Sequence, residues 1–401
     1  MDHTTAILLE VFIIFAAAQA GGVVARWMRL PDVVGQIVIG CAVGPSVLGW
    51  ITPSEPLEVL SEIGVVLLLF AVGLETRLED VKRVGGSALA VGVIGVIVPF
   101  VCGTLWAHSI GPDWPRSLFV AAAFVATSAG ITAAVLKQMG ALRRTESRVI
   151  LGAAVIDDIL AMLLLGVVVA IQAGGSLRVG SLLAVAGEAV GFVLVVGWLG
   201  TLVMRRGSKW LEHTRNPMSP LLVVLVLCLG LAWLATRFGL AAIIGAFLAG
   251  MIASETRQRV QLEEQMQPLL ALLTPFFFVL TGAKVDLARL AGGEALWLLL
   301  VATLLAVVTK LVGGWLGALR LGPRSALIVG VGMIPRGEVG IVVAALGLSA
   351  GVFGDTLYAV IIAMSLLTSI IAPPFLALLL RRGPGTLQDP GLESGHSQGN
   401  A

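Results

Sequence analysis

Charge is scarce in this sequence, and that scarcity sets the class of protein. Only 12% of the 401 residues are Asp, Glu, Lys or Arg, whereas 58% are apolar. Apolar stretches of about 20 residues, the length of a bilayer-spanning helix, recur along the chain. The alternation of apolar and polar residues that marks an outer-membrane barrel is missing. The sequence therefore predicts an all-α polytopic membrane protein with little soluble mass.

Cysteine and net charge are equally sparse. Cys41, Cys102 and Cys228 lie singly in different apolar stretches, so their spacing predicts neither a disulfide framework nor a metal site with Cys ligands. The formal net charge of +2 is too small to indicate a nucleic-acid partner. The first residues lack the positive segment of a signal peptide, so we expect the first apolar run to stay in the mature protein. We expect the lipid bilayer as its surroundings and no cofactor.

Apolar runs bounded by charge, Gly or Pro predict thirteen membrane spans. The loops that follow odd-numbered spans, together with the C-terminus, hold 19 Lys and Arg residues, and the other side holds 5. The positive-inside rule then predicts an external N-terminus and a cytoplasmic C-terminus. The predicted spans are residues 5–28, 33–50, 57–76, 85–110, 115–139, 146–172, 180–206, 217–237, 239–255, 260–286, 294–320, 323–349 and 353–382.

Two adjacent aspartates and two cations stand out among the ionisable residues deep inside these spans. Asp157 and Asp158 are adjacent in an apolar run, where one charge near the bilayer centre costs at least roughly 2.5 to 3.5 kcal/mol. At about 1.5 Å per residue, Asp158 and Lys310 lie about 18 and 15 Å from the cytoplasmic ends of their spans. Lys310 and Arg336 need anionic partners, a water-filled cavity or helix carbonyls at this depth. We therefore expect a midplane site at which at least one aspartate binds a cation or a proton.

Two spans carry helix-breaking stretches at the same depth. Residues 127–132 combine hydroxyls with a glycine, and residues 332–338 read Gly-Met-Ile-Pro-Arg-Gly-Glu. Neither stretch is tolerated facing lipid, so both are expected to line a site. The two spans are the fifth and the twelfth and run in opposite directions, as in an inverted repeat with two crossed discontinuous helices around a midplane transport site.

The polar groups of these breaks suit a hard monovalent cation. Thr127, Ser128 and Thr132 offer neutral oxygens, and the half-helix ends offer carbonyls. Hydroxyls bonded back to their own backbone are an equally open alternative. Arg336 and Glu338 flank Gly337 and are expected to stabilise the second break, paired with each other or with the half-helix ends. Glu75 ends an apolar span, where an interfacial charge is the favoured interpretation and an ion-attracting funnel residue is the alternative.

The stretches Thr127-Ser128, Ile156-Asp157-Asp158 and 332–338, together with Lys310, resemble in this order the monovalent cation:proton antiporter-2 family, and in particular its NapA-type Na+/H+ antiporters. The resemblance covers the chain from residue 30 to about residue 382 and implies an NhaA/NapA-like fold. It implies that Asp158 is the carboxylate that binds Na+ and the proton, and that Asp157 pairs with Lys310. Thr127 and Ser128 match the unwound segment beside the ion. The Asp-Asp pair together with the lysine matches the electrogenic members.

The resemblance also implies a division into a panel domain, through which the protein forms a homodimer, and a moving core domain. The panel would comprise residues 1–79 and 208–290. The core would comprise residues 80–172 and 291–382, with a linking helix at 173–207 and a disordered cytoplasmic tail at 383–401.

The function we expect is electrogenic antiport of Na+ against protons by an elevator-like movement, in the service of pH homeostasis, with both ions competing at Asp158. One alternative is a K+/H+ antiporter of the same family. Another is a Na+-coupled symporter of organic anions, which should show a larger polar cavity. An intramembrane aspartyl protease is disfavoured, because adjacent aspartates point about 100° apart on one helix.

Overall fold

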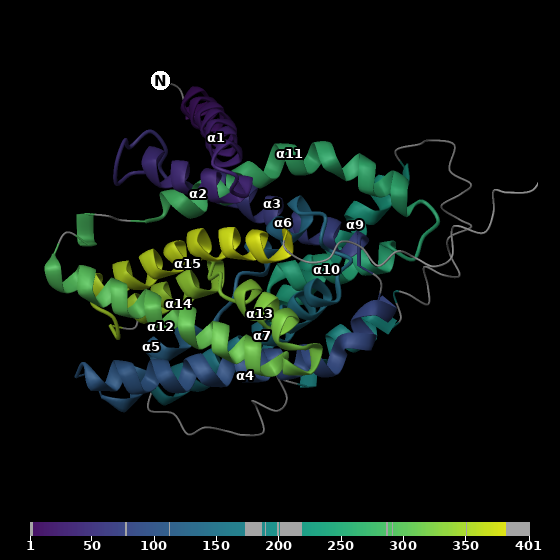
Figure 1. Ribbon diagram of the computed structural model, residues 1–401. Helices are drawn as coiled ribbons and strands as arrows, with labels where there is room; N and C mark the ends of the chain where they lie inside the picture. The colour runs from purple at the N-terminus through teal and green to yellow at the C-terminus, as the bar shows by residue number, and fades with distance from the viewer. Residues whose placement is uncertain are drawn as a thin grey trace, which may run out of the picture.

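Every regular element that the computed structural model describes is a helix. The described residues are 3–76, 78–111, 113–172, 187–188, 190–198, 200, 219–285, 288–290, 292–349 and 351–381. The chain contains both long helices and shorter ones (Figure 1). The long helices are α1 (His3–Trp27), α3 (Glu55–Leu74), α4 (Leu78–Ser109), α7 (Thr145–Gln172), α9 (Ser219–Arg237), α11 (Arg259–Ala283), α12 (Gly293–Gly317) and α15 (Asp355–Arg381). The shorter α-helices are α2 (Asp32–Val43), α5 (Trp114–Val125), α6 (Ala129–Gln138), α10 (Ala242–Ala253), α13 (Pro323–Gly332) and α14 (Glu338–Ser349), with 3-10 turns at η1 (Ala288–Leu290) and η2 (Leu319–Leu321).

The second span is shorter than the sequence pattern predicts. A helix was expected over 33–50, but α2 ends at Val43 and Gly44 adopts an extended conformation with ψ 176°. Pro45 follows directly, and a proline excludes the residue before it from the helical region. With 12 residues, α2 is about 18 Å long and does not cross a roughly 30 Å hydrocarbon core as a helix.

Both predicted helix breaks are present, with sharper bounds than the sequence indicated. The fifth span is interrupted only at residues 126–128, between α5 and α6, so Gly130 and Thr132 lie inside α6. The twelfth span is interrupted at residues 333–337, between α13 and α14. Pro335 accounts for the second break, because it has no N–H to donate to a helix.

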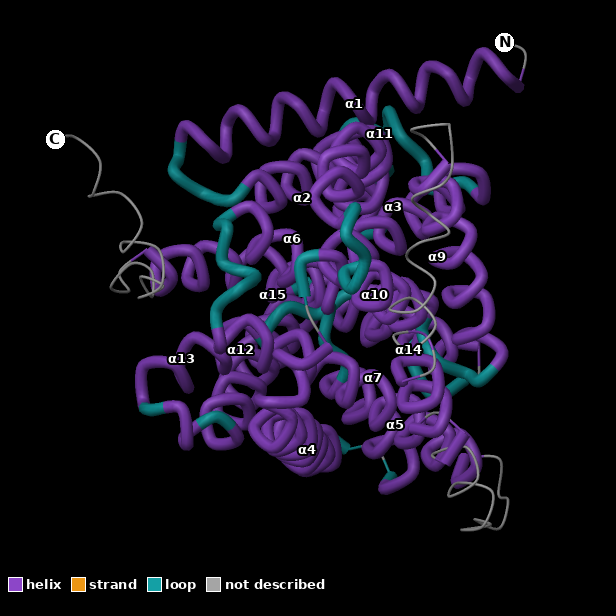
Figure 2. The backbone as a smooth tube through the Cα atoms, turned by 90° about the vertical axis from the view of Figure 1, so that its right-hand side faces the viewer, coloured by secondary structure: helices purple, strands orange, loops and turns teal. Residues whose placement is uncertain are grey.

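The helices pack in two groups. In one group α3 packs along α10 and α11, and α2 packs along α1 and α11; in the other α4 packs along α5, α7 and α12, and α12 contacts α13 and α15. Figures 1 and 2 show α1, α2 and α11 on one side of the molecule and α4 and α12 on the opposite side. Glycines allow backbone contact within the first group: a Cβ on Gly250 would lie 2.1 Å from the Phe70 carbonyl oxygen. Small residues at such crossings are typical of helix packing in membranes.

The outer surface of the helices suits a bilayer. Phe12, Val226 and Leu304 are largely exposed although each lies in the middle of an apolar helix. Among the described residues, nine helical segments are long and apolar enough to cross a membrane, and α2 and α10 are shorter apolar helices. Most of the predicted span 180–206, and the predicted tail 383–401, lie outside the described residues. The chain is therefore a multi-pass helical membrane protein.

Candidate functional site

The buried lysine of α12 meets the first aspartate of α7. Lys310 Nζ donates to Asp157 Oδ1 at 2.7 Å, and both side chains are fully buried. Its other two donors go to main-chain carbonyl oxygens, Gly95 O at 2.9 Å and Val125 O at 2.7 Å. Val125 is the last residue of α5, so the helix break leaves its carbonyl without an intrahelical partner. An ammonium has three donors, and all three are used here. The contact with Asp157 that the resemblance implies is therefore present. Helix carbonyls were also expected as partners for Lys310, but the sequence does not identify them as those of Gly95 and Val125.

Asp158 faces a different direction from its neighbour. Its side chain is 4% exposed and lines a small cavity of about 10 Å³. This volume is about that of one water-sized particle. One wall comes from α6 and α7, and the opposite wall is apolar and comes from α3 and α10, with Leu69, Ile243, Ile244 and Phe247. Adjacent helical residues diverge by about 100°, so Asp157 faces Lys310 while Asp158 faces the boundary between the two helix groups.

The two helix breaks are joined to each other. Ser128 donates its backbone N–H to Pro335 O at 2.7 Å, and the Thr132 hydroxyl donates to Gly332 O at 2.8 Å. The Thr127 hydroxyl approaches Met333 O at 3.5 Å, at the limit of a hydrogen bond. The alternative in which the hydroxyl bonds back to its own backbone is thus wrong for Thr132. Backbone groups freed at one break are satisfied by the other, which is how an irregular segment is tolerated at this depth.

Arg336 secures the first break from within the second. Its guanidinium is fully buried and donates to Ala126 O at 2.9 Å and to Ala306 O at 3.3 Å. Its own backbone is held by α15, because its N–H donates to the Thr368 hydroxyl and Ser369 donates to its carbonyl oxygen.

The side chain of Glu338 lies outside the described residues, and with it the predicted Arg336–Glu338 pair. The sequence signal for the α15 contacts is three hydroxyl residues at Ser365, Thr368 and Ser369, a spacing that places them on one face of a helix.

Arg336→Gln is expected to destabilise the protein more than any surface arginine variant. A glutamine in its place removes at least one of the guanidinium hydrogen bonds to the Ala126 and Ala306 carbonyls. The Ala126 carbonyl lies in the break between α5 and α6, and a buried polar group left unsatisfied costs about 1 to 3 kcal/mol. Thermal unfolding in detergent measures the loss. Arg116→Gln is the matched control, since that side chain is 56% exposed and forms a surface ion pair with Asp113. Equal melting temperatures for the two variants would contradict a structural role for Arg336.

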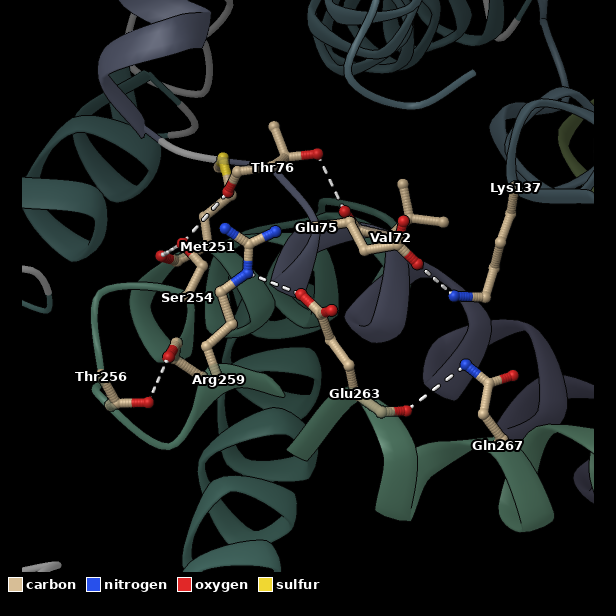
Figure 3. Close-up of polar contacts among 11 residues, drawn as sticks. Val72, Glu75, Thr76, Lys137, Met251, Ser254, Thr256, Arg259, Glu263 and Gln267 are labelled. Carbon is tan, nitrogen blue, oxygen red and sulfur yellow. Dashed lines mark hydrogen bonds and ion pairs between the residues drawn. The ribbon is translucent and has the colours of Figure 1, made fainter. Parts of the chain in front are cut away.

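Glu75 lies apart from this cluster. It caps the C-terminal end of α3, and its carboxylate forms an ion pair with Lys137 near the end of α6 (Figure 3). The pair lines a separate cavity of about 530 Å³ that also reaches Asp32 and Gln267. Nothing in the local sequence pattern links Lys137 to a residue 62 positions earlier.

Comparison with known proteins shows the family of this chain. The family model described as the transmembrane sodium/hydrogen exchanger matches residues 11–382. The chain is 34% identical over 372 residues to the Na+/H+-K+ antiporter GerN of Bacillus cereus, covering 92% of this chain and 94% of that protein. It is 36% identical over 412 residues to the high-affinity Na+/H+ antiporter NhaS3 of Synechocystis, covering 92% and 89%.

The fold is also shared with a solved structure. That of the sodium proton antiporter MjNhaP1 from Methanocaldococcus jannaschii superposes with a TM-score of 0.69 at 18% identity, over 95% of this chain and 99% of that one. The resemblance to cation:proton antiporters read from the motifs is confirmed at the level of the family. The chain belongs to the transmembrane sodium/hydrogen exchanger family, and it is a membrane antiporter rather than an enzyme.

Proposed function

We propose that this protein is an electrogenic antiporter of monovalent cations and protons, with Na+ as the main cation, and that cation and proton compete for the carboxylate of Asp158. The observation that carries the proposal is the divergence of the two aspartates. Lys310 neutralises Asp157, whereas Asp158 lines a cavity of the size of one small particle at the boundary between two helix groups. One carboxylate can hold either one monovalent cation or one proton, and such a choice couples the two fluxes.

The packing of the helices supports an elevator-like movement. We assign residues 80–172 and 291–382 to a moving core and residues 1–79 and 208–290 to a panel, joined by a linking helix at 173–207. Asp158 belongs to the core, and the apolar side chains opposite it on α3 and α10 belong to the panel. A core that slides past this wall would expose Asp158 to each side in turn, while the wall blocks a continuous pore.

The remaining architecture follows the same proposal. It comprises thirteen spans arranged as an inverted repeat, in which the α5/α6 and α13/α14 breaks cross and Thr127 and Ser128 lie beside the ion. The main-chain contact from Ser128 to Pro335 brings the two breaks together as such a crossing requires. We place the protein as a homodimer in the bacterial inner membrane, with the N-terminus outside.

The size of the site separates the alternative substrates. A Na+-coupled symporter of organic anions needs a polar cavity that admits the anion, whereas the cavity at Asp158 measures about 10 Å³. A dehydrated monovalent cation fits such a space, so the structure favours ion exchange. The name of the GerN relative includes both Na+ and K+. K+/H+ antiport therefore stays as the second candidate, and exchange assays with each cation added in turn to proteoliposomes containing a pH dye distinguish the two.

The apparent KM for Na+ is expected to rise as pH falls. A lower pH places protons on more of the Asp158 carboxylates, so more Na+ is needed to fill half of the sites, while the maximal rate at saturating Na+ changes less. The rise approaches about tenfold per pH unit where most sites hold a proton. The measurement is the initial rate of Na+-driven proton movement in proteoliposomes at mildly acidic and alkaline pH. An unchanged KM would indicate separate sites for cation and proton.

A further inference from the structure

The C-terminal end of α6 is tied to α3 and α2 by two polar contacts. Lys137 forms the ion pair with Glu75 of α3 (Figure 3). The adjacent residue Gln138 accepts a hydrogen bond through Oε1 from the backbone N–H of Asp32, the first residue of α2, at 3.0 Å. Both contacts join a core helix to a panel helix, so they connect the two parts that the proposed movement separates.

The surroundings of this ion pair make it stronger than an ordinary surface pair. The side chains of Lys137 and Glu75 are only 17% and 25% exposed. Charges in such a partly buried site are screened less by water and salt than fully exposed ones. Lys137 also lies in the last turn of α6, where the negative end of the helix dipole favours a cation. The nearby charges of Arg259 and Glu263 pair with each other at 2.6 Å. Among the residues that the structure describes, Lys137 pairs with Glu75, and Arg259 and Glu263 form a separate pair.

The opposite end of the same helix reaches the transport site. Ala129, the first residue of α6, lines the Asp158 cavity, and Lys137 lies eight residues further on, about 12 Å along the axis. A constraint on the Lys137 end thus fixes the position of the helix that borders Asp158. The 530 Å³ cavity beside Glu75 is also lined by Lys137, Gln138 and Asp32, so the two contacts line its wall between α6 and the panel.

From this geometry we propose that Lys137 and Glu75, assisted by Gln138 and the Asp32 backbone, form a latch between the core and the panel that must open in every transport cycle. The proposal rests on the elevator movement given under Proposed function. In the orientation proposed there, the latch lies on the cytoplasmic side of the protein. The structure therefore corresponds to a state in which the ion pair must break before the core can move and open Asp158 to the cytoplasm. Lys137 and Glu75 are positioning residues, because they act on access to Asp158 and do not touch the ion there.

A reversible cross-link tests the latch. In a background with Cys41, Cys102 and Cys228 replaced by serine, Glu75→Cys and Lys137→Cys are combined and bridged with a short bifunctional thiol reagent that a reductant cleaves. Na+-driven proton movement in proteoliposomes is expected to fall to the level of empty liposomes on bridging and to return on reduction.

The chain offers a matched control on the same helix. Lys284 at the end of α11 pairs with Glu58 at the start of α3 at 3.1 Å, and both helices belong to the panel. Bridging Glu58→Cys to Lys284→Cys should leave exchange at its rate before bridging, because it joins two parts that move together. Exchange that continues unchanged in the bridged Glu75/Lys137 protein would overturn the latch. The same protein before bridging tests the proposed function separately, since its exchange does not depend on the cross-link.

A charge exchange provides a second measurement. Lys137→Glu places two carboxylates together and opens the latch, so the apparent KM for the cation on that side should change severalfold. The double variant Lys137→Glu/Glu75→Lys has an ion pair again, with the two charges exchanged between α6 and α3. By the logic of a double-mutant cycle, its KM should return to within about twofold of wild type. A double variant that behaves like Lys137→Glu alone would also overturn the proposal.

Discussion

Asp158→Asn is expected to reduce cation-driven proton movement to the level of empty liposomes, for every monovalent cation tested. An amide is nearly the same size as a carboxylate, so the small cavity and its apolar wall should be preserved. The amide carries no proton to exchange and no negative charge to neutralise a cation in a low-dielectric site. The measurement is the initial rate of Na+-driven and Li+-driven proton movement in proteoliposomes of known protein content.

The neighbouring aspartate provides the control for this variant. Asp157→Asn is expected to be milder, because Asp157 is already neutralised by Lys310 and does not line the Asp158 cavity. Thermal unfolding of both variants in detergent separates loss of transport from loss of fold. More than a small residual rate in a folded Asp158→Asn protein would contradict the assignment of Asp158 as the carboxylate that binds cation and proton.

Lys310→Gln is expected to make the remaining transport electroneutral and to lower stability at the same time. If Lys310 carries a second proton, two protons cross for each Na+ and one net charge moves per cycle, which couples exchange to voltage at about 2.3 kcal/mol per 100 mV. Glutamine cannot carry that proton, whereas Asp158 can still exchange one proton for one Na+. The measurement compares Na+-driven proton movement at zero and inside-negative potential, set with a K+ gradient and valinomycin.

The contacts of Lys310 specify the control that this experiment needs. Removing the ammonium leaves Asp157 as a buried unpaired charge, and breaking such a pair costs about 3 to 5 kcal/mol. Lys310→Gln combined with Asp157→Asn removes both charges. The double variant should therefore regain much of the stability that Lys310→Gln alone loses, and it should show the same voltage response as Lys310→Gln. An active Lys310→Gln protein with the wild-type voltage response would make Lys310 a structural counter-charge and place the coupling charge on the aspartates.

Features that depend on local composition could be predicted from the sequence. The apolar runs predicted the membrane class, because a helix in lipid needs about 20 apolar residues wherever it lies. The Pro335 break was predictable since proline has no N–H in any context. Asp157, Asp158, Lys310 and Arg336 were identified as site candidates because each is too costly in an apolar span without a function or a partner. The family followed from the motifs at 127–128, 156–158 and 332–338 together with Lys310, and the family comparison confirms it.

Features that depend on two distant segments were decided only by the tertiary structure. The position of Lys310 in sequence does not show that its other two acceptors are the Gly95 and Val125 carbonyls, because backbone groups carry no sequence signal. Nor does the order of Asp157 and Asp158 show which of them faces α3 and α10, since that depends on how α7 is rotated in the bundle.

The same limit applies at the end of α6. Lys137 and Glu75 each read as an ordinary charge at the end of a span, and only the packing of α6 beside α3 brings them together. Hydropathy and helix-breaking residues determine what each segment is, since they act within a few turns of one helix. The pairing of side chains, and therefore the site, depends on contacts between helices that are far apart in the chain, such as α7 and α12. These contacts form only when the helices pack together.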